Sequence, residues 1–267
     1  MKGLRQRYFI VDAFTNQPFK GNPAAVVLLG KLCEDEALRN VAMEMNLSET
    51  AFLLPNPIGY DLRWFTPKVE VDLCGHATLA ASLVLAQIGQ LSNGDEVKFA
   101  TRSGILRASC NGSTIELDFP LQQETMTQPP SGLLESLNVS AGYVGKNQFD
   151  YLVEVESESV LRGITPDFKQ LAGISCRGVI VTAQSADPQF DFASRFFAPA
   201  VGIDEDPVTG SAHCCLADFW RKRLGRAKLI GHQVSPRGGV VHVEVRGERV
   251  LLGGEGVIVA EGELLVG

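Results

Sequence analysis

Residues 72–89, "DLCGHATLAASLVLAQIG", contain a segment that predicts a helix buried on every side. Between Ala77 and Ile88 nearly all side chains are apolar, and a helix that is apolar on all faces belongs inside a domain. Gly89 stands where a glycine commonly ends a helix. The first turn differs, because Gly75 lets another backbone approach closely and His76 is polar. The first N–H groups of a helix have no partners within it, so this end favours an anion.

A second stretch repeats this arrangement. "RWFTP" at 63–67 precedes "GHA" at 75–77, and "RFFAP" at 195–199 precedes "GSA" at 210–212. Each of these short motifs then leads into a mostly apolar segment that ends in glycine. Both fragments are common enough to recur by chance, which is the alternative. The repeat favours an α+β fold of two similar halves, each a curved mixed β-sheet or barrel wrapped around a central apolar helix.

The length of 267 residues exceeds the usual size of a single core, which also favours two domains. The predicted N-terminal half is 1–122, with its central helix near 76–88. The predicted C-terminal half is 123–267, with its central helix near 210–224 and a last strand able to pack back on the first half. The polar, proline-rich stretch 121–132 is the predicted linker. If the halves are related by the repeat, the two polar helix starts should face each other across a cleft.

Other segments predict the elements around these helices. Apolar runs such as "RYFIVDAF" and "AAVVLL" are typical of strands, and "ILRASCNGSTIELDF" predicts a hairpin around Asn111–Gly112. "DEALRNVAMEMN" has the spacing of an amphipathic helix on the outside of a sheet. "TPDFKQLAGI" predicts a helix with Thr165 or Asp167 near its cap.

Composition excludes several classes of function. A net charge of −7 and a pI near 5.2 argue against nucleic acid or an acidic membrane as the main partner. No apolar run approaches a membrane span, and the N-terminus reads as a strand, not a signal peptide. Without a secretion signal, the six cysteines are interpreted as reduced thiols of a cytoplasmic protein.

The residue types at four positions would suit a zinc site. Cys74, His76, His213 and Cys214 are all common zinc ligands. The neighbouring cysteines Cys214 and Cys215 would point to different faces of a helix, however, and no metal-binding spacing recurs. The sequence therefore predicts no metal.

Two stretches of the first half carry candidate chemistry. Glu49 in "NLSETAF" follows an amphipathic helix and precedes an apolar strand. It is either a capping or surface carboxylate, or a general acid/base whose pKa burial would raise. His76 at the start of the buried helix is either a structural hydrogen-bonding group or part of a site.

The second half has a matching stretch, "GIDEDPVTGSAHCCLADFW" at 202–220. Asp206 precedes a turn in which Thr209, Gly210 and Ser211 would deliver N–H groups and a hydroxyl to a helix start. An ordinary N-cap formed by Thr209 or Ser211 is the alternative.

Five stretches taken together resemble the phenazine-biosynthesis PhzF family. They are "VDAFTNQPFKGNPAAVV", "EMNLSETAFL", "RWFTPKVEVDLCGHATLAAS", "FFAPAVGIDEDPVTGSAH" and "QVSPRGGVVHVEV", in the order of the family and over nearly the whole chain. The resemblance implies the diaminopimelate-epimerase-like fold, which agrees with the repeat. It also implies an isomerase that moves a proton between carbons without a cofactor. The type reaction of the family is the isomerisation of a dihydro-hydroxyanthranilate.

The resemblance also assigns roles. Glu49 matches the acid/base glutamate, His76 matches the histidine of the first helix start, and Asp206 matches the acid before the second. The residues expected to bind substrate are Gly75, Thr209, Gly210 and Ser211. The expected substrate is a small carboxylate, an amino or hydroxy acid with cyclic forms included. A homodimer is compatible with the resemblance.

One departure from the wider fold bears on the mechanism. In thiol-dependent epimerases and racemases of this fold, a cysteine opens each of two facing helices. Cys74 stands at the first of these positions, but Pro207 occupies the second. A two-base racemase is therefore disfavoured, and a one-base shift by Glu49 is preferred. A racemase using Cys74 and a metabolite-binding protein without catalytic activity remain the alternatives.

Overall fold

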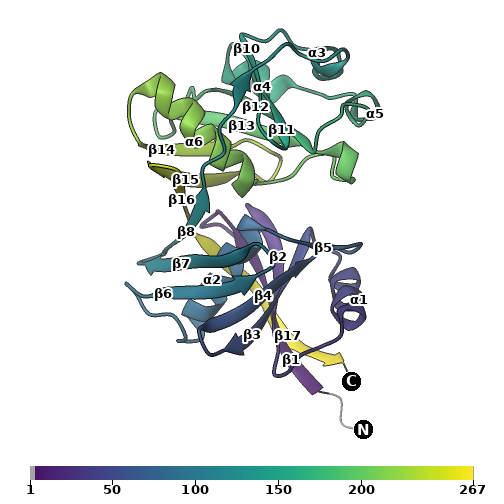
Figure 1. Ribbon diagram of the computed structural model, residues 1–267, viewed down its shortest axis with the longest axis vertical. Coiled ribbons are helices and arrows are strands. Elements are labelled where there is room, and N and C mark those ends of the chain that lie inside the picture. Colours follow the sequence, from purple (N-terminus) through teal and green to yellow (C-terminus); the bar gives the residue numbers. More distant parts are fainter. Residues whose placement is uncertain (1–3, 267) are drawn as a thin grey trace. The chain divides into compact units, whose positions relative to one another are not determined.

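The computed structural model describes residues 4–266, which divide into two compact units (Figure 1). The first unit comprises the chain up to Phe119 together with the chain from Gly253 onward, and the second comprises Pro120–Leu252. The sequence-based division placed 123–267 in the second half, with its last strand able to pack back. In the structure the returning C-terminal segment is part of the first unit. Each unit is described here by itself.

The first unit is a mixed sheet with two helices. Its strands are β1 (Leu4–Ala13), β2 (Asn22–Leu28), β3 (Glu49–Asn56), β4 (Gly59–Phe65), β5 (Glu70–Val71), β6 (Glu96–Thr101), β7 (Gly104–Asn111), β8 (Thr114–Pro120) and β17 (Gly256–Val266). Its helices are α1 (Asp35–Met45) and α2 (Gly75–Gln87). The strand β17, yellow in Figure 1, runs antiparallel beside the purple β1, from Leu4 opposite Val266 to Ala13 opposite Gly256.

The second unit has the same general make-up. Its strands are β9 (Thr125–Met126), β10 (Tyr143–Lys146), β11 (Asp150–Glu154), β12 (Gly178–Gln184), β13 (Phe192–Phe197), β14 (Lys228–Gln233), β15 (Gly239–Arg246) and β16 (Arg249–Gly254). Its helices are α3 (Leu133–Leu137), α4 (Glu158–Gly163), α5 (Phe168–Leu171), the short 3₁₀ helix η1 (Pro199–Val201) and α6 (Gly210–Leu224). None of the helices in the described part of the chain is long and apolar enough to cross a bilayer.

Strand pairing repeats between the units. From β1 to β7 in the first unit, successive partners pair antiparallel (β1–β2), parallel (β2–β3), antiparallel (β3–β4), parallel (β4–β6) and antiparallel (β6–β7). From β10 to β15 the second unit follows the same alternation. The motif "RWFTP" begins in β4 and "RFFAP" begins in β13, and α2 and α6 follow these equivalent strands. The predicted α+β fold of two similar halves is confirmed.

Helix α2 is the central helix of the first unit. It packs against β1, β2, β3, β7 and β17, and its side chains from His76 to Ser82 are all buried. The polar side chains inside it bond back to the helix itself: Thr78 Oγ1 donates to the Cys74 carbonyl at 2.5 Å and Ser82 Oγ donates to the Thr78 carbonyl at 2.8 Å. These bonds remove the cost of burying two hydroxyls, so an apolar environment on all sides is tolerated.

Helix α6 has the corresponding place in the second unit, against β14 and β15. Its residues from Ala212 to Trp220 are buried, and the Trp220 ring stacks on Phe192 at a centroid distance of 5.9 Å. Gly225 ends the helix in the left-handed conformation, with φ of 70° and its N–H bonded to the Arg221 carbonyl. The predicted helix 210–224 is therefore confirmed.

Three smaller segments test predictions that were made from local sequence patterns. The hairpin at Asn111–Gly112 is confirmed, since β7 and β8 pair with Asn111 opposite Thr114. The helix predicted in 165–174 is confirmed as the short α5, which Asp167 caps by accepting from the Gln170 N–H at 2.9 Å. The predicted linker 121–132 is wrong in part, because it contains β9, which pairs with β10.

Candidate active site

The start of α2 brings Glu49 and His76 together inside the first unit. Asn22 begins β2 and Glu49 begins the neighbouring parallel strand β3, where Ala24 lies opposite Glu49. His76 is the second residue of α2. Its Nε2 atom lies 3.2 Å from Glu49 Oε2, and Asn22 Nδ2 lies 3.3 Å from its Nδ1 atom. Two strand starts and a helix start thus converge on one imidazole.

The imidazole of His76 is neutral. The side chain is nearly inaccessible, and this burial lowers the pKa of His76 to about 3. The amide of Asn22 donates to Nδ1, so the ring proton is on Nε2, the nitrogen that faces Glu49. Nε2 makes no hydrogen bond of good geometry with any residue that the structure describes. Its N–H is therefore a donor placed beside the carboxylate of Glu49.

Cys74 lies at the N-cap position of α2 and belongs to the same cluster. Its Sγ atom lies 3.6 Å from His76 Nδ1, and the residue is 7% exposed. The thiol is on the opposite ring nitrogen from the one near Glu49. Cys74 thus lies at the Nδ1 side of the imidazole, and Glu49 lies at the Nε2 side.

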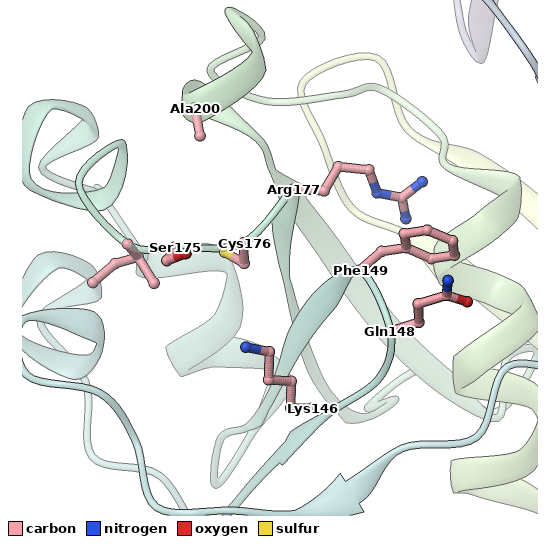
Figure 2. A pocket seen from close by; sticks show the side chains of 8 residues that line it. Lys146, Gln148, Phe149, Ser175, Cys176, Arg177 and Ala200 are labelled. Carbon is pink, nitrogen blue, oxygen red and sulfur yellow. The ribbon is translucent and has the colours of Figure 1, made fainter.

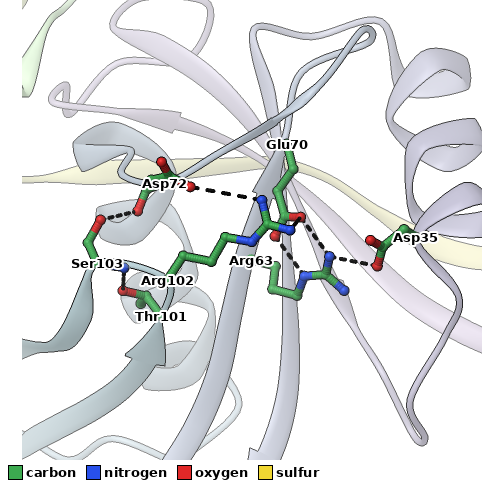
Figure 3. A network of polar contacts seen from close by, with 7 residues as sticks. All are labelled: Asp35, Arg63, Glu70, Asp72, Thr101, Arg102 and Ser103. Atoms are coloured by element: carbon green, nitrogen blue, oxygen red, sulfur yellow. Dashed lines mark hydrogen bonds and ion pairs between the residues drawn. The ribbon is translucent and has the colours of Figure 1, made fainter.

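An ionic network holds the segment that leads into this cluster (Figure 3). The carboxylate of Glu70, in β5, accepts two hydrogen bonds from Arg63 at 2.7 Å and pairs with Arg102 at 2.7 Å. Arg63 also pairs with Asp35 in the first turn of α1. Ser103 donates to the Asp72 carbonyl at 2.7 Å. Residues 70–72 are thereby tied to three other elements just before the start of α2.

The loop before Asn22 is shaped by a close backbone approach. Gly21 has φ of 64°, and a Cβ atom there would lie 2.1 Å from the Ala13 carbonyl oxygen. The buried carboxylate of Asp12 accepts a hydrogen bond from the Phe19 N–H at 2.6 Å and holds the same loop. Only glycine fits at position 21, and the fit sets the position of the amide that orients His76.

In the second unit, the start of α6 is organised by Gln233. Its side chain accepts from the Thr209 N–H at 2.9 Å and donates to the Asp206 carbonyl at 2.7 Å. The Thr209 hydroxyl donates to the Asp206 carboxylate at 2.5 Å. Thr209 occupies the N-cap position, but its side chain makes no capping bond, so the simple N-cap interpretation of this residue is wrong. Its hydroxyl orients Asp206 instead.

Ser211, one residue into α6, contacts an arginine from elsewhere in the second unit. Arg177 Nη2 donates to Ser211 Oγ at 3.0 Å, and the same guanidinium forms a two-pronged ion pair with the buried Asp150. Gly210, the first residue of α6, is buried. Neither Arg177 nor Asp150 is among the residues that the sequence singled out.

A separate depression of about 470 Å³ opens in the second unit (Figure 2). It is lined by Lys146, Gln148, Phe149, Ile174, Ser175, Cys176, Arg177 and Ala200. None of the predicted site residues lines it. Figure 2 shows the guanidinium of Arg177 over the Phe149 ring, while Lys146 extends to the other side. Arg177, one of its lining residues, donates to Ser211.

Glu49, Cys74 and His76 are also the described residues that offer a set of metal ligands. One ligand atom from each lies within 4.8 Å of the others. The start of α2 carries a partial positive charge, which opposes a cation at this place. The sequence-based expectation of no metal stays a prediction, and the zinc set that included His213 and Cys214 gains no support, since His213 Nδ1 bonds to the Thr209 carbonyl at 2.8 Å.

Comparisons with known proteins agree on one family. The family model described as "phenazine biosynthesis-like protein" matches residues 11–262. An uncharacterized isomerase of Halalkalibacterium halodurans is 50% identical over 97% of this chain and 98% of its own length. An uncharacterized isomerase of Pseudomonas aeruginosa is 49% identical over 96% of this chain and 97% of its own.

Solved structures extend the likeness to the fold. The crystal structure of a PhzF-family phenazine biosynthesis protein from Enterococcus faecalis has a TM-score of 0.93, with 40% identity, 98% of this chain and 99% of that chain covered. A hydroxyproline epimerase from Agrobacterium vitis has a TM-score of 0.59 at 13% identity, with 99% and 92% covered, which shows a shared fold alone.

Proposed function

This chain belongs to the phenazine biosynthesis-like family and is an isomerase, and on that premise we propose that it moves a proton on a small carboxylate with Glu49 as its single acid and base. The observation that carries the proposal is the 3.2 Å distance between Glu49 Oε2 and His76 Nε2. A base needs a carboxylate that is held in place, and an enolate-like intermediate needs a nearby donor. The cluster supplies both from the first unit.

The proposed step conserves electrons and atoms. Glu49 takes a proton from one carbon of the substrate, and the electron pair of that C–H bond delocalises toward an electron-withdrawing group. The same carboxyl group then returns the proton to a second carbon. An isomerisation of this kind requires no net oxidant or reductant, which agrees with the prediction that no cofactor is needed.

His76 has the role of a neutral donor in this scheme. With a pKa of about 3 the ring stays uncharged at neutral pH and does not compete with Glu49 as a base. Its Nε2–H can donate to the oxygen on which negative charge develops. The amide of Asn22 fixes this tautomer.

We assign substrate binding to the helix starts. Gly75 begins α2, while Gly210 and Ser211 begin α6, and the first N–H groups of each helix favour a carboxylate. Asp206, oriented by Thr209, would accept from an amine or hydroxyl of the substrate. The proposed substrate is therefore an amino or hydroxy acid. That both helix starts serve one ligand stays a prediction, as does a homodimer.

The thiol-dependent racemase remains the second candidate, because Cys74 lies 3.6 Å from His76. The position equivalent to a second thiol is Pro207, so only one of two opposed thiols is present. A protein that binds a metabolite without catalysis is the third candidate.

Solvent-deuterium exchange into a panel of amino, hydroxy and cyclohexadiene carboxylic acids distinguishes the three. A racemase exchanges an α-proton, a one-base isomerase rearranges the substrate with little exchange, and a binding protein does neither. Glu49→Gln keeps the shape of the side chain but cannot carry a proton, so the rate should fall by about 10²–10⁴-fold. Glu44→Gln, at an exposed position in α1, is the matched control and should change nothing. Activity of Glu49→Gln within tenfold of the unmodified protein would assign the chemistry to another residue.

Crystals tell whether the start of α6 binds an anion. Grown in sulfate or a carboxylate buffer, they should show an anion within hydrogen-bonding distance of the Gly210 or Ser211 N–H. An α6 start that stays without an anion in such crystals would contradict the assignment of the substrate carboxylate to it.

A further inference from the structure

Arg177 is held rigidly beside Ser211 by contacts within the second unit. Its Nε donates to Asp150 Oδ1 at 2.8 Å and its Nη2 donates to Asp150 Oδ2. Asp150 is 1% exposed, so this carboxylate has little freedom to move. Two parallel N–H···O bonds fix both the place and the plane of a guanidinium, which a lysine could not reproduce.

Aromatic rings restrict the guanidinium further. The Arg177 Cζ atom lies 5.1 Å from the centre of the Phe149 ring and 5.7 Å from that of Phe196 (Figure 2 shows Phe149). The Phe196 ring itself fits only because position 178 is glycine, since a Cβ atom there would lie 2.3 Å from the ring. The arginine is therefore in place before any ligand binds.

This arrangement determines what the Ser211 hydroxyl can do. Arg177 Nη2 donates to Ser211 Oγ at 3.0 Å, and an arginine has no lone pair with which to accept. Ser211 Oγ is the acceptor in this contact, so its single O–H must donate elsewhere. A positive charge on the acceptor side of a hydroxyl also makes the hydroxyl a stronger donor, because hydrogen bonds in a chain polarise one another.

We propose that Arg177 is a positioning residue that commits Ser211 to donate its hydroxyl proton to an anionic group of the substrate. The inference rests on the proposed role of Ser211 in binding the substrate carboxylate. Arg177 acts through Ser211, and Asp150 acts through Arg177. The specificity that results is for a negatively charged acceptor, such as a carboxylate, because its hydrogen bond with this donor is stronger than that of a neutral alcohol or amide of the same shape.

Sulfate titration tests the proposal without turnover. The amide signals of Gly210 and Ser211 in ¹⁵N-labelled protein report anion binding directly. We expect Arg177→Gln to weaken sulfate binding at least tenfold and Ser211→Ala to weaken it similarly. The double variant should be no worse than either single variant, because the two residues act as one unit. Additive losses, sulfate binding unchanged in Arg177→Gln, or no saturable binding to the unmodified protein would each overturn the proposal.

Matched variants separate positioning from folding. Arg177→Gln leaves the carboxylate of Asp150 buried without its ion pair, so Arg177→Gln/Asp150→Asn is the second variant and should show the same weakened binding. Arg177→Lys keeps the charge and should recover part of the affinity. Arg223→Gln is the control: Arg223 also pairs with a glutamate, Glu154, and stacks on Phe219, and its loss should change the sulfate affinity less than twofold. Full affinity in the Arg177→Gln/Asp150→Asn variant would refute the proposal.

A kinetic measurement gives a second readout once the exchange panel yields a substrate. Loss of a positioning residue for the carboxylate should raise KM more than it lowers kcat, whereas Glu49→Gln should lower kcat. Arg177 is refuted as a positioning residue if KM is unchanged. The Glu49 mechanism does not depend on this result, since it is tested by proton movement alone.

Discussion

At the scale of single residues, the position of Cys74 distinguishes a thiol mechanism from a carboxylate mechanism. Its Sγ atom contacts Nδ1 of His76, the ring nitrogen that also meets Asn22, while Glu49 lies at Nε2. A buried thiol in this place packs as a small apolar side chain. Glu49, in contrast, has a side chain 13% exposed and is accessible to a ligand.

Cys74→Ala should therefore retain activity within about tenfold, whereas loss of an acid–base group costs about 10²–10⁴-fold. The measurement is the rate of substrate conversion, with folding checked by circular dichroism. Cys110→Ala, at a buried position in β7, is the matched control. Complete inactivation of Cys74→Ala alone, or alkylation of Cys74 that substrate prevents, would restore the thiol mechanism.

The sequence did not single out the residues that orient the candidate site residues. Glu49 and His76 stand in recognisable motifs, and the structure brings them together. Asn22 and Gln233 lie in two of the stretches that resemble the family. Asn22 begins β2 and Gln233 ends β14, and a polar side chain at the end of an apolar strand is the only local feature that indicates a role for either residue. Arg177 is 34 positions from Ser211, and no periodicity relates the two. Such contacts depend on which strands are neighbours in the sheet, and the alternation of apolar residues in a strand does not identify its partner.

At the scale of elements, the long helices could be predicted and the short strand β9 could not. The buried α2 and α6 have patterns of several turns and glycines at their ends, which explains their accurate bounds. β9 has two residues, Thr125 and Met126, both exposed, in a proline-rich stretch. Two exposed residues have no alternation to detect, so its pairing with β10 could not be predicted.

The network at Glu70 supports a prediction at this scale, because it ties β5 to α1, β4 and the β6–β7 hairpin (Figure 3). The Glu70 side chain is 7% exposed and accepts from two arginines. Glu70→Gln should lower the free energy of unfolding by about 1–3 kcal/mol, since hydrogen bonds between charged groups contribute that much when one partner is buried. Urea unfolding measures the change.

The control for this network is an exposed ion pair in the same unit. Glu96 pairs with Arg107, and both side chains are 46% exposed, so Glu96→Gln should cost less than about 0.5 kcal/mol. Glu70→Gln should also reduce catalysis, because residues 70–72 lead directly into Cys74 and His76. An unfolding free energy unchanged by Glu70→Gln would show that the network has no structural role.

At the scale of the whole molecule, the C-terminal strand pairs with the N-terminal strand. β17 pairs with β1 across a separation of more than 240 residues, and both strands pack against α2. The sequence was compatible with a last strand that packs against the first half, but it did not require one. The residues of an apolar strand do not identify the strand with which it pairs. The internal repeat was the stronger guide, since it related α2 to α6 through equivalent positions.

Each central helix carries a buried neutral histidine near its start, His76 in α2 and His213 in α6, and both make the stability of the molecule depend on pH. Burial lowers the pKa of His76 to about 3 and that of His213 to about 4, against about 6.5 in the unfolded chain. Between these values the unfolded state binds more protons than the folded state. Stability is therefore full above pH 6.5 and falls as the pH drops toward 4.

Each of these two histidines should lower the free energy of unfolding by about 2 kcal/mol when the pH falls from 7 to 5. Below pH 6.5 the change in this free energy approaches about 1.4 kcal/mol per pH unit for each histidine. His213→Gln tests the share of α6, because glutamine does not titrate and its amide can donate to the Thr209 carbonyl as Nδ1 does. Between pH 7 and pH 5 the free energy of unfolding of this variant, measured with urea, should fall by about 2 kcal/mol less than that of the unmodified protein. An equal pH dependence in His213→Gln and the unmodified protein would mean that His213 is protonated in the folded state, against its burial.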